Sequence, residues 1–184
     1  FSETSLKGAH FVEICGQRKI PLLFLQNITG FMVGKKAEAG GIAKDGAKMV
    51  NAVSNSVVPK ISLVIGGSYG AGNYAMSGRA YAPRFLYAWP SAKIAVMGGD
   101  SAAKTLSTIK LSKMNNASEE DKEKIYNQIK NKYTKQSDPR YAAARLWIDE
   151  IINPLDTRKI IIESLDIVKN EGEIKKATYG AMQV

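Results

Sequence analysis

Cysteine and histidine are nearly missing from this chain of 184 residues, which contains one of each. The single cysteine, Cys15, excludes an internal disulfide and any metal site built from several cysteines. It lies in an apolar helical stretch, which favours a buried, unreactive thiol over a nucleophile. The single histidine, His10, is next to Phe11 on the same predicted helix. We expect a packed or surface histidine, because a Ser/His/Asp triad would have to be built around this residue alone.

Long hydrophobic runs are also missing. The longest ones, Ile20 to Leu25 and Ile61 to Ile65, have the length of a strand, whereas a membrane-spanning helix needs about 20 apolar residues. No signal or transit pattern opens the chain, which starts at Phe1 without a methionine. We interpret this start as a cut and expect a piece of a longer protein. The length allows one sizeable core, and 45% hydrophobic residues are ordinary for a globular domain.

Negative charge is scarce, since 26 Lys and Arg face 17 Asp and Glu, for a net charge of +9. About half of this excess falls in residues 104–145, where acidic and basic residues alternate in helix-like sequence. This pattern favours a solvated helical face over a phosphate-binding surface. Nucleic-acid binding is therefore the least favoured function, because it rests on net charge alone.

The order of apolar segments predicts a layered α/β fold. Helical spacing over Leu6 to Arg18 is followed by a near-continuous apolar strand from Ile20, of the kind buried on both faces of a parallel sheet. A glycine-containing loop from Asn27 to Gly41 then leads into a second helix that ends at Pro59, and the pattern repeats with a strand at Lys60 to Ile65. The later predicted elements are strands at Phe85–Trp89 and Lys93–Met97, helices at Ser101–Ile109 and Glu119–Tyr133, and a helix capped by Asn153.

The segment directly after the second strand carries the strongest functional signal. Residues 66–73 read Gly-Gly-Ser-Tyr-Gly-Ala-Gly-Asn, with four glycines in seven residues, and the next residues can continue as a helix. Glycine lets the backbone approach a ligand closely, and the N–H groups at a helix start attract negative charge. We therefore expect an anion or oxyanion site made of backbone amides.

A second glycine-rich loop, residues 29–41, follows the first strand. Loops at the carboxyl ends of parallel strands meet at one crevice, so both loops are expected to line one site. Neither loop ends in Gly-Lys-Ser/Thr, which excludes a P-loop, and the glycines after Ile65 have the wrong order for a dinucleotide fingerprint. The alternative is that both loops are only tight turns that lead into helices and bind no ligand.

Acidic residues add little to this site. Asp149, Glu150 and Asp156 occur close together near Arg158, and we expect helix capping and ion pairing there rather than a catalytic dyad. Glu38 and Asp45 border the first loop.

Long collinear blocks of the chain resemble the carboxyltransferase (β) subunits of biotin-dependent acyl-CoA carboxylases, and most closely the methylcrotonoyl-CoA carboxylase branch. The blocks that carry this resemblance are residues 1–3, 7–11, 20–34, 41–50, 65–74, 78–81, 83–87, 89–90 and 96–99, together with Pro154 and residues 156–158. The likeness covers nearly the whole chain. It is weakest from Lys110 to Gln136, within the polar helical segment at about 110–136.

The resemblance implies a crotonase-like (ClpP/crotonase) fold in which residues 1–184 form a partial C-terminal carboxyltransferase domain, truncated at its N-terminus. It implies that the amides of Ala71 and Gly72 are the catalytic oxyanion hole, which holds the ureido oxygen of carboxybiotin. The implied biotin-binding residues are Gly30, Phe31, Tyr69 and Gly70. No histidine or glutamate base is needed for this chemistry, and no metal is expected in this chain.

The resemblance also implies partners. These are an acyl-CoA substrate, a biotin carried by the biotin carboxylase (α) subunit, and further β subunits in a hexamer, with no nucleic acid and no membrane. The expected location is the cytoplasm for a bacterial protein and the mitochondrial matrix for a eukaryotic one. The implied activity is carboxyl transfer to 3-methylcrotonoyl-CoA in leucine breakdown, with no activity expected of the fragment alone.

Several alternatives stay open. Geranoyl-CoA and propionyl-CoA carboxylases share the fold and differ in the volume of the acyl pocket. A hydratase or thioesterase would need a paired acid and base, and no such glutamate pair accompanies the helix at Ala71. An assembly module that docks a biotin-carrying partner without chemistry of its own is the remaining alternative.

Overall fold

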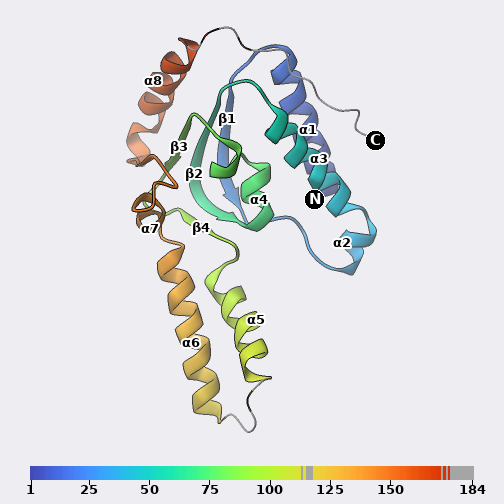
Figure 1. Cartoon of the computed structure of the whole chain (residues 1–184), viewed down its shortest axis with the longest axis vertical. Coiled ribbons are helices and arrows are strands. Elements are labelled where there is room, and N and C mark those ends of the chain that lie inside the picture. The colour runs from blue at the N-terminus through green and yellow to red at the C-terminus, as the bar shows by residue number, and fades with distance from the viewer. Residues whose placement is uncertain (113, 115–117, 171, 173, 175–184) are drawn as a thin grey trace.

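The computed structural model describes residues 1–112, 114, 118–170, 172 and 174. Its centre is a parallel sheet in the order β1-β2-β3-β5, with β4 pairing β2 beyond the end of β3 (Figure 1). The strands are β1 (Leu22–Ile28), β2 (Lys60–Tyr69), β3 (Phe85–Ala88), β4 (Lys93–Ala95) and β5 (Glu150–Ile151). The α/β architecture expected from the sequence is confirmed.

Helices cover the sheet from both sides, as Figure 1 shows. α1 (Ser2–Gln17) and α3 (Ile42–Asn55) pack on one face, where Val12, Phe24 and Val53 lie in one core cluster. α8 (Thr157–Lys169) packs on the other face, where its Ile161 joins Leu63 and Tyr87. The remaining helices are α2 (Lys35–Ala39), α4 (Gly70–Ala75), α5 (Gly99–Leu111), α6 (Glu119–Gln136) and α7 (Pro139–Ala143), with short 3-10 turns at Arg79–Tyr81 and Pro154–Asp156.

The first strand is buried on one face only, which corrects the expectation of a strand buried on both. Leu22, Phe24 and Gln26 are buried, whereas the alternating residues Leu23 and Leu25 are 43% and 51% exposed. The physical reason is the place of β1 at the end of the strand order, where α8 does not reach. Among the described residues, only the face toward α1 and α3 is covered.

The glycine run after Ile65 is not a loop, which is a second correction. β2 continues through Gly66, Gly67 and Ser68 to Tyr69, and its last residues pair with β4. The register with β1 changes within this run, because Gln26 is opposite Val64 while Ile28 is opposite Ser68. Asn27 fills the irregularity by accepting a hydrogen bond from the Gly67 N–H at 3.1 Å. A Cβ on Gly66 would overlap this Asn27 amide, which explains the glycine there.

α5 and α6 form a hairpin that projects away from the sheet (Figure 1). The Asp100 carboxylate near the start of α5 accepts from Lys130 at 2.8 Å and from the Tyr126 hydroxyl at 3.2 Å, which joins the two helices. Ser118 caps α6 by accepting from the Asp121 N–H, as its sequence Ser-Glu-Glu-Asp favours. The predicted helix at Glu119–Tyr133 is thus confirmed, while residues 113 and 115–117 of the polar segment lie outside the described residues.

The predicted N-cap at Asn153 is present. Its side chain accepts from the Leu155 N–H at 3.1 Å, but the capped element is the 3-10 turn Pro154–Asp156, which leads into α8. One further difference is α2, which lies within the segment expected to be a loop.

Candidate active site

The N-terminus of α4 places two backbone amides at the carboxyl end of β2. Ala71 and Gly72 are the second and third residues of this helix, so their N–H groups have no acceptor within it. In the described part of the chain, neither nitrogen donates to a turn, a loop or a side chain either. The chain enters the helix through Gly70, whose φ of +55° is a left-handed value that favours glycine. Both N–H groups are therefore unpaired within the described structure, at the exposed Ala71 and at the buried Gly72.

The two glycine-rich segments meet at this point, as the sequence predicts. A Cβ on Gly72 would lie 3.1 Å from the Gly30 Cα and 2.9 Å from the Ile28 side chain. A Cβ on Gly30, whose φ is +115°, would lie 3.6 Å from the Tyr69 carbonyl oxygen. Only glycine allows the two backbones to approach this closely. The loop after β1 therefore covers the start of α4.

Ala71 is exposed and lines two cavities at once. The first, which we call the aromatic pocket, has a volume of about 490 Å³ and includes Tyr74, Tyr133, Tyr141 and Trp147 in its wall. The second, which we call the apolar pocket, has a volume of about 530 Å³ and extends along α3 from Phe31. Ala71 thus lies where two cavities of small-molecule size meet.

One wall of the aromatic pocket is built from the ends of α6 and α7. The rings of Tyr141 and Trp147 pack edge to face with centroids 6.1 Å apart, and the Arg145 guanidinium lies 3.4 Å from the centre of the Tyr141 ring. Such contacts hold flat side chains in one orientation. They give the pocket a rigid aromatic side.

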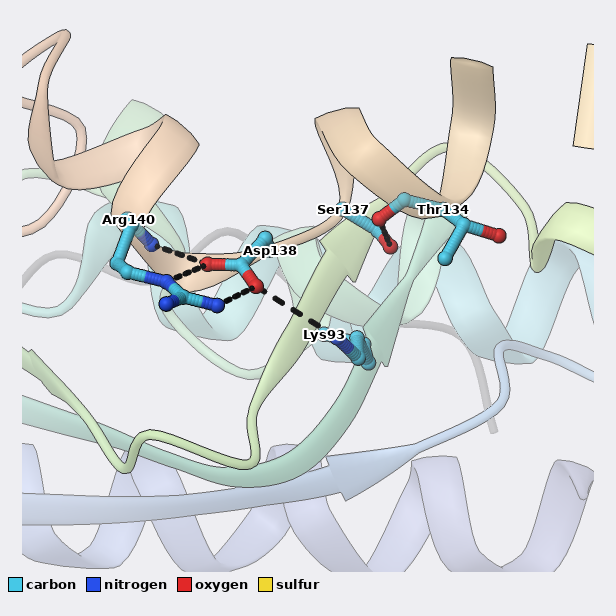
Figure 2. A network of polar contacts seen from close by, with 5 residues as sticks. All are labelled: Lys93, Thr134, Ser137, Asp138 and Arg140. Atoms are coloured by element: carbon cyan, nitrogen blue, oxygen red, sulfur yellow. Dashed lines mark hydrogen bonds and ion pairs between the residues drawn. The ribbon is translucent and has the colours of Figure 1, made fainter. Parts of the chain in front are cut away.

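A polar network fixes this wall to the sheet (Figure 2). Asp138 accepts from the Arg140 N–H, Nε and guanidinium nitrogen at 2.9, 2.8 and 2.7 Å, and its second oxygen lies 4.0 Å from Lys93 Nζ on β4. The hydrogen bonds from Arg140 hold the pKa of Asp138 far below its ordinary value. The Ile94 N–H donates to the Ser137 carbonyl at 2.9 Å, and the Ser137 hydroxyl donates to the Thr134 carbonyl at 3.0 Å. β4, α6 and α7 are thereby joined beside the pocket.

The predicted site residues divide between the two cavities. Gly70 and Ala71 line the aromatic pocket, and Phe31 lines the apolar pocket and packs against Gly46 of α3. Gly30 and the buried Gly72 form the contact between the two segments, and the Tyr69 ring lies over Gly67. The structure brings the two glycine-rich segments together, while the roles of the individual residues stay predictions.

The aromatic wall was not identified from the sequence. Tyr133, Tyr141 and Trp147 lie more than sixty residues after Ala71, on segments whose local pattern indicates only helix and turn. A weak signal was available in the spacing of Ile125, Ile129 and Tyr133 on one helical face. This spacing does not show that Tyr133 borders a cavity, because that depends on how α6 packs against β4.

The late acidic cluster is confirmed in part, because ion pairing is present while Asp156, at the N-cap of α8, makes no side-chain cap hydrogen bond. Asp149 forms an ion pair, although its partner is Arg79 rather than Arg158. Cys15 is buried, and His10 is exposed on α1. Within the described residues, no cluster of three or more His, Cys, Asp or Glu side chains could hold a metal ion, and no helix is long and apolar enough to cross a membrane.

Comparison with known proteins identifies the family of this chain. Residues 1–179 match the carboxyl transferase domain. The chain is 52% identical over its whole length to a biotin-dependent 3-methylcrotonyl-coenzyme A carboxylase beta1 subunit of Mycobacterium tuberculosis, of which it covers 35%. Over 92% of its length it is 55% identical to a probable mitochondrial methylcrotonoyl-CoA carboxylase beta chain of Drosophila melanogaster, of which it covers 30%.

Solved structures share the fold. The beta subunit of geranyl-CoA carboxylase from P. aeruginosa superimposes with a TM-score of 0.87 at 42% identity, and transcarboxylase 12S, a hexamer assembly, with 0.84 at 35%. Each alignment covers 98% of this chain and about a third of the other. The chain therefore has the crotonase-like fold of carboxyltransferase subunits, spans about a third of the length of these relatives, and belongs to the carboxyl transferase domain family.

Proposed function

We propose that this chain is the biotin-side part of a carboxyltransferase that acts on 3-methylcrotonoyl-CoA. The observation that carries the proposal is the position of Ala71, which lines both cavities and whose amide is unpaired in the described structure. For a group to pass between two molecules, both must bind next to the hydrogen-bond donor that stabilises the negative charge formed during transfer. The likeness to methylcrotonoyl-CoA carboxylase beta chains supports the choice of reaction and substrate.

The site fits biotin by the chemistry of its donors and walls. Carboxybiotin would supply an activated carboxyl group whose release leaves negative charge on the ureido oxygen. The N–H groups of Ala71 and Gly72 would donate to that oxygen, and each such donor is worth roughly 2.7–4 kcal/mol of transition-state stabilisation. Tyr141 and Trp147 would pack against the face of the bound ring system. Glycine at 72 lets the loop at Gly30 pack directly against the start of α4.

Proton transfer does not require a side chain of this site. Histidine and a carboxylate pair are not among the described residues that line the two cavities. The walls can instead exclude water from the reacting groups, which strengthens the hydrogen bonds of the two amides.

The partners follow from the same proposal. The biotin would arrive on a partner subunit, since relatives of this family are biotin-dependent carboxylase subunits, and the hexamer of transcarboxylase 12S supports a hexamer of β subunits. The mitochondrial names of the fly, slime-mould and plant relatives support the mitochondrial matrix for a eukaryotic source of this chain. For a bacterial source the proposed location is the cytoplasm.

The test replaces Gly72 with Ala in the full-length subunit, assembled with its biotin-carrying partner. The added Cβ would lie 3.1 Å from the Gly30 Cα and would displace the amides from their position. A misplacement of this kind lowers kcat by roughly 100-fold. Gly98→Ala is the matched control, because its φ of −62° suits alanine and nothing lies within 4 Å of the new Cβ. Unchanged turnover in correctly assembled Gly72→Ala enzyme would instead support a scaffold without chemistry.

Geranyl-CoA carboxylation is the alternative supported by a structural neighbour at 42% identity. Comparing kcat/KM for 3-methylcrotonoyl-CoA, geranoyl-CoA and propionyl-CoA in the same holoenzyme separates the three substrates. We expect 3-methylcrotonoyl-CoA to be preferred, and a higher value for either of the others would overturn the substrate assignment.

A further inference from the structure

A chain of three buried polar side chains runs beneath α4. Gln26 of β1 and Ser68 of β2 are both 0% exposed, and Asn73 of α4 is half-buried. Gln26 Nε2 donates to the Met76 carbonyl at 2.6 Å, the Ser68 hydroxyl donates to Gln26 Oε1 at 2.6 Å, and Asn73 Nδ2 donates to Ser68 Oγ at 2.8 Å. These hydrogen bonds therefore connect the middle and the C-terminal end of the helix to two strands.

The directions of these three hydrogen bonds follow from the Met76 carbonyl, at which the series ends. The Met76 carbonyl can only accept, so Gln26 must present its amide nitrogen there and its amide oxygen to Ser68. Ser68 gives its only proton to Gln26 and can therefore only accept from Asn73. The Asn73 amide is held by Gly78, where any Cβ would overlap it, and the Gly78 N–H donates to the Asn73 carbonyl at 2.8 Å. One arrangement of the four groups satisfies all of them.

α4 depends on these anchors because it is short. A helix of six residues is unstable by itself, and its backbone direction is set by what holds it. Asn73 directly follows Gly72, and Met76 is the residue at which the helix ends. The hydrogen bonds of Gln26, Ser68 and Asn73 thus hold α4 on the C-terminal side of the Ala71 and Gly72 amides.

We propose that Gln26, Ser68 and Asn73 are positioning residues for carboxyl transfer, which set the direction of the Ala71 and Gly72 N–H groups. This inference rests on the proposed function. Ser68 and Asn73 also belong to the wall of the aromatic pocket, and the role proposed here is exerted through the backbone of α4. Their loss would lower the stabilisation of charge in the transition state while leaving the binding of acyl-CoA nearly unchanged, so the effect falls on kcat and not on KM.

The decisive variant is Ser68→Ala in the full-length subunit with its biotin-carrying partner. It removes one oxygen atom and breaks the chain in the middle. Ser62→Ala is the matched control, because Ser62 is also 0% exposed on β2 and donates to the Ser77 carbonyl at 2.6 Å, outside the chain. Both variants lose one buried hydroxyl and should lower the melting temperature, Ser68→Ala by more because it breaks two hydrogen bonds where Ser62→Ala breaks one.

We expect Ser68→Ala to lower kcat roughly 10- to 100-fold, below the 10²–10³-fold loss typical of deleting an oxyanion donor outright. Its KM for acyl-CoA should stay within about threefold, and Ser62→Ala should keep its kcat. If Ser68→Ala does not assemble, Asn73→Ala is the second variant. It removes only the hydrogen bond from Asn73 to Ser68. Equal kcat in the Ser68 or Asn73 variant and the control would overturn the inference.

Gly72→Ala in the same preparation separates the two proposals. If Gly72→Ala loses turnover and Ser68→Ala does not, the positioning role is wrong and the amide site stands. If neither variant changes turnover, the amide site itself is wrong.

Discussion

The Arg79 guanidinium donates a hydrogen bond to the Asp149 carboxylate at 2.7 Å, which ties the turn after α4 to the segment that carries Trp147. Arg79 Nε also donates to the Trp147 carbonyl at 2.9 Å, and the other Asp149 oxygen accepts from the Leu86 N–H at 2.7 Å. Replacing Asp149 by Ala would leave the Leu86 N–H without its acceptor. Because Asp149 is partly exposed, we expect a loss near the low end of the usual range, about 1 kcal/mol in the free energy of unfolding by urea. Asp166→Ala, which breaks only the exposed pair with Lys169, should cost clearly less.

The Asp138 network should make stability depend on pH in a defined direction. Its pKa in the folded chain lies below the ordinary value of 3.8, so the ionised carboxylate favours the folded state. This contribution is fully present above the ordinary pKa and is lost as pH falls below it. Asp138→Asn should therefore lower the urea midpoint at pH 7, and the difference from the unchanged chain should shrink below pH 3.8. A difference that stays constant or grows toward acid would contradict this assignment.

Gly70 should tolerate substitution poorly for a reason separate from catalysis. Alanine at φ +55° costs roughly 1–2 kcal/mol, and its Cβ would lie 3.1 Å from the Val96 carbonyl oxygen. We expect Gly70→Ala to lower the free energy of unfolding by at least this amount. Gly98→Ala, at a negative φ and in open space, should change it little, and equal stability of the two variants would argue against the left-handed conformation at Gly70.

The chain by itself should have no carboxylase activity. It covers 30–35% of the length of the beta chains that it matches, and most of the acyl-CoA pocket is expected in the rest of the protein. Purified residues 1–184 should give no carboxylated product from 3-methylcrotonoyl-CoA and carboxybiotin, while the full-length holoenzyme does. Turnover by the verified fragment without a partner chain would show that the two amides and their pockets suffice.

Much of the fold could be predicted because its signals are local. The apolar run at residues 61–65, the helical spacing from Ile42 and the Asn153–Pro154 cap each depend on neighbours within one or two turns. The same holds for the start of α4 after its glycines. β1 was only partly predicted, since a continuous apolar run cannot show that its strand lies at the end of the sheet and is covered on one face.

The sequence by itself determined the parallel α/β pattern, the family and the segment that offers backbone amides. Only the tertiary structure decided that Gly66 and Gly67 belong to a strand, that Ala71 lies between two cavities, and that Ser68 bonds Gln26 across 42 residues. The reason is that backbone preference and hydrophobic period act over a few residues, whereas these contacts depend on the register between β1 and β2, which shifts after Gln26. A change of one residue in that register would turn the Gln26 side chain to the other face of the sheet and leave Ser68 without its acceptor.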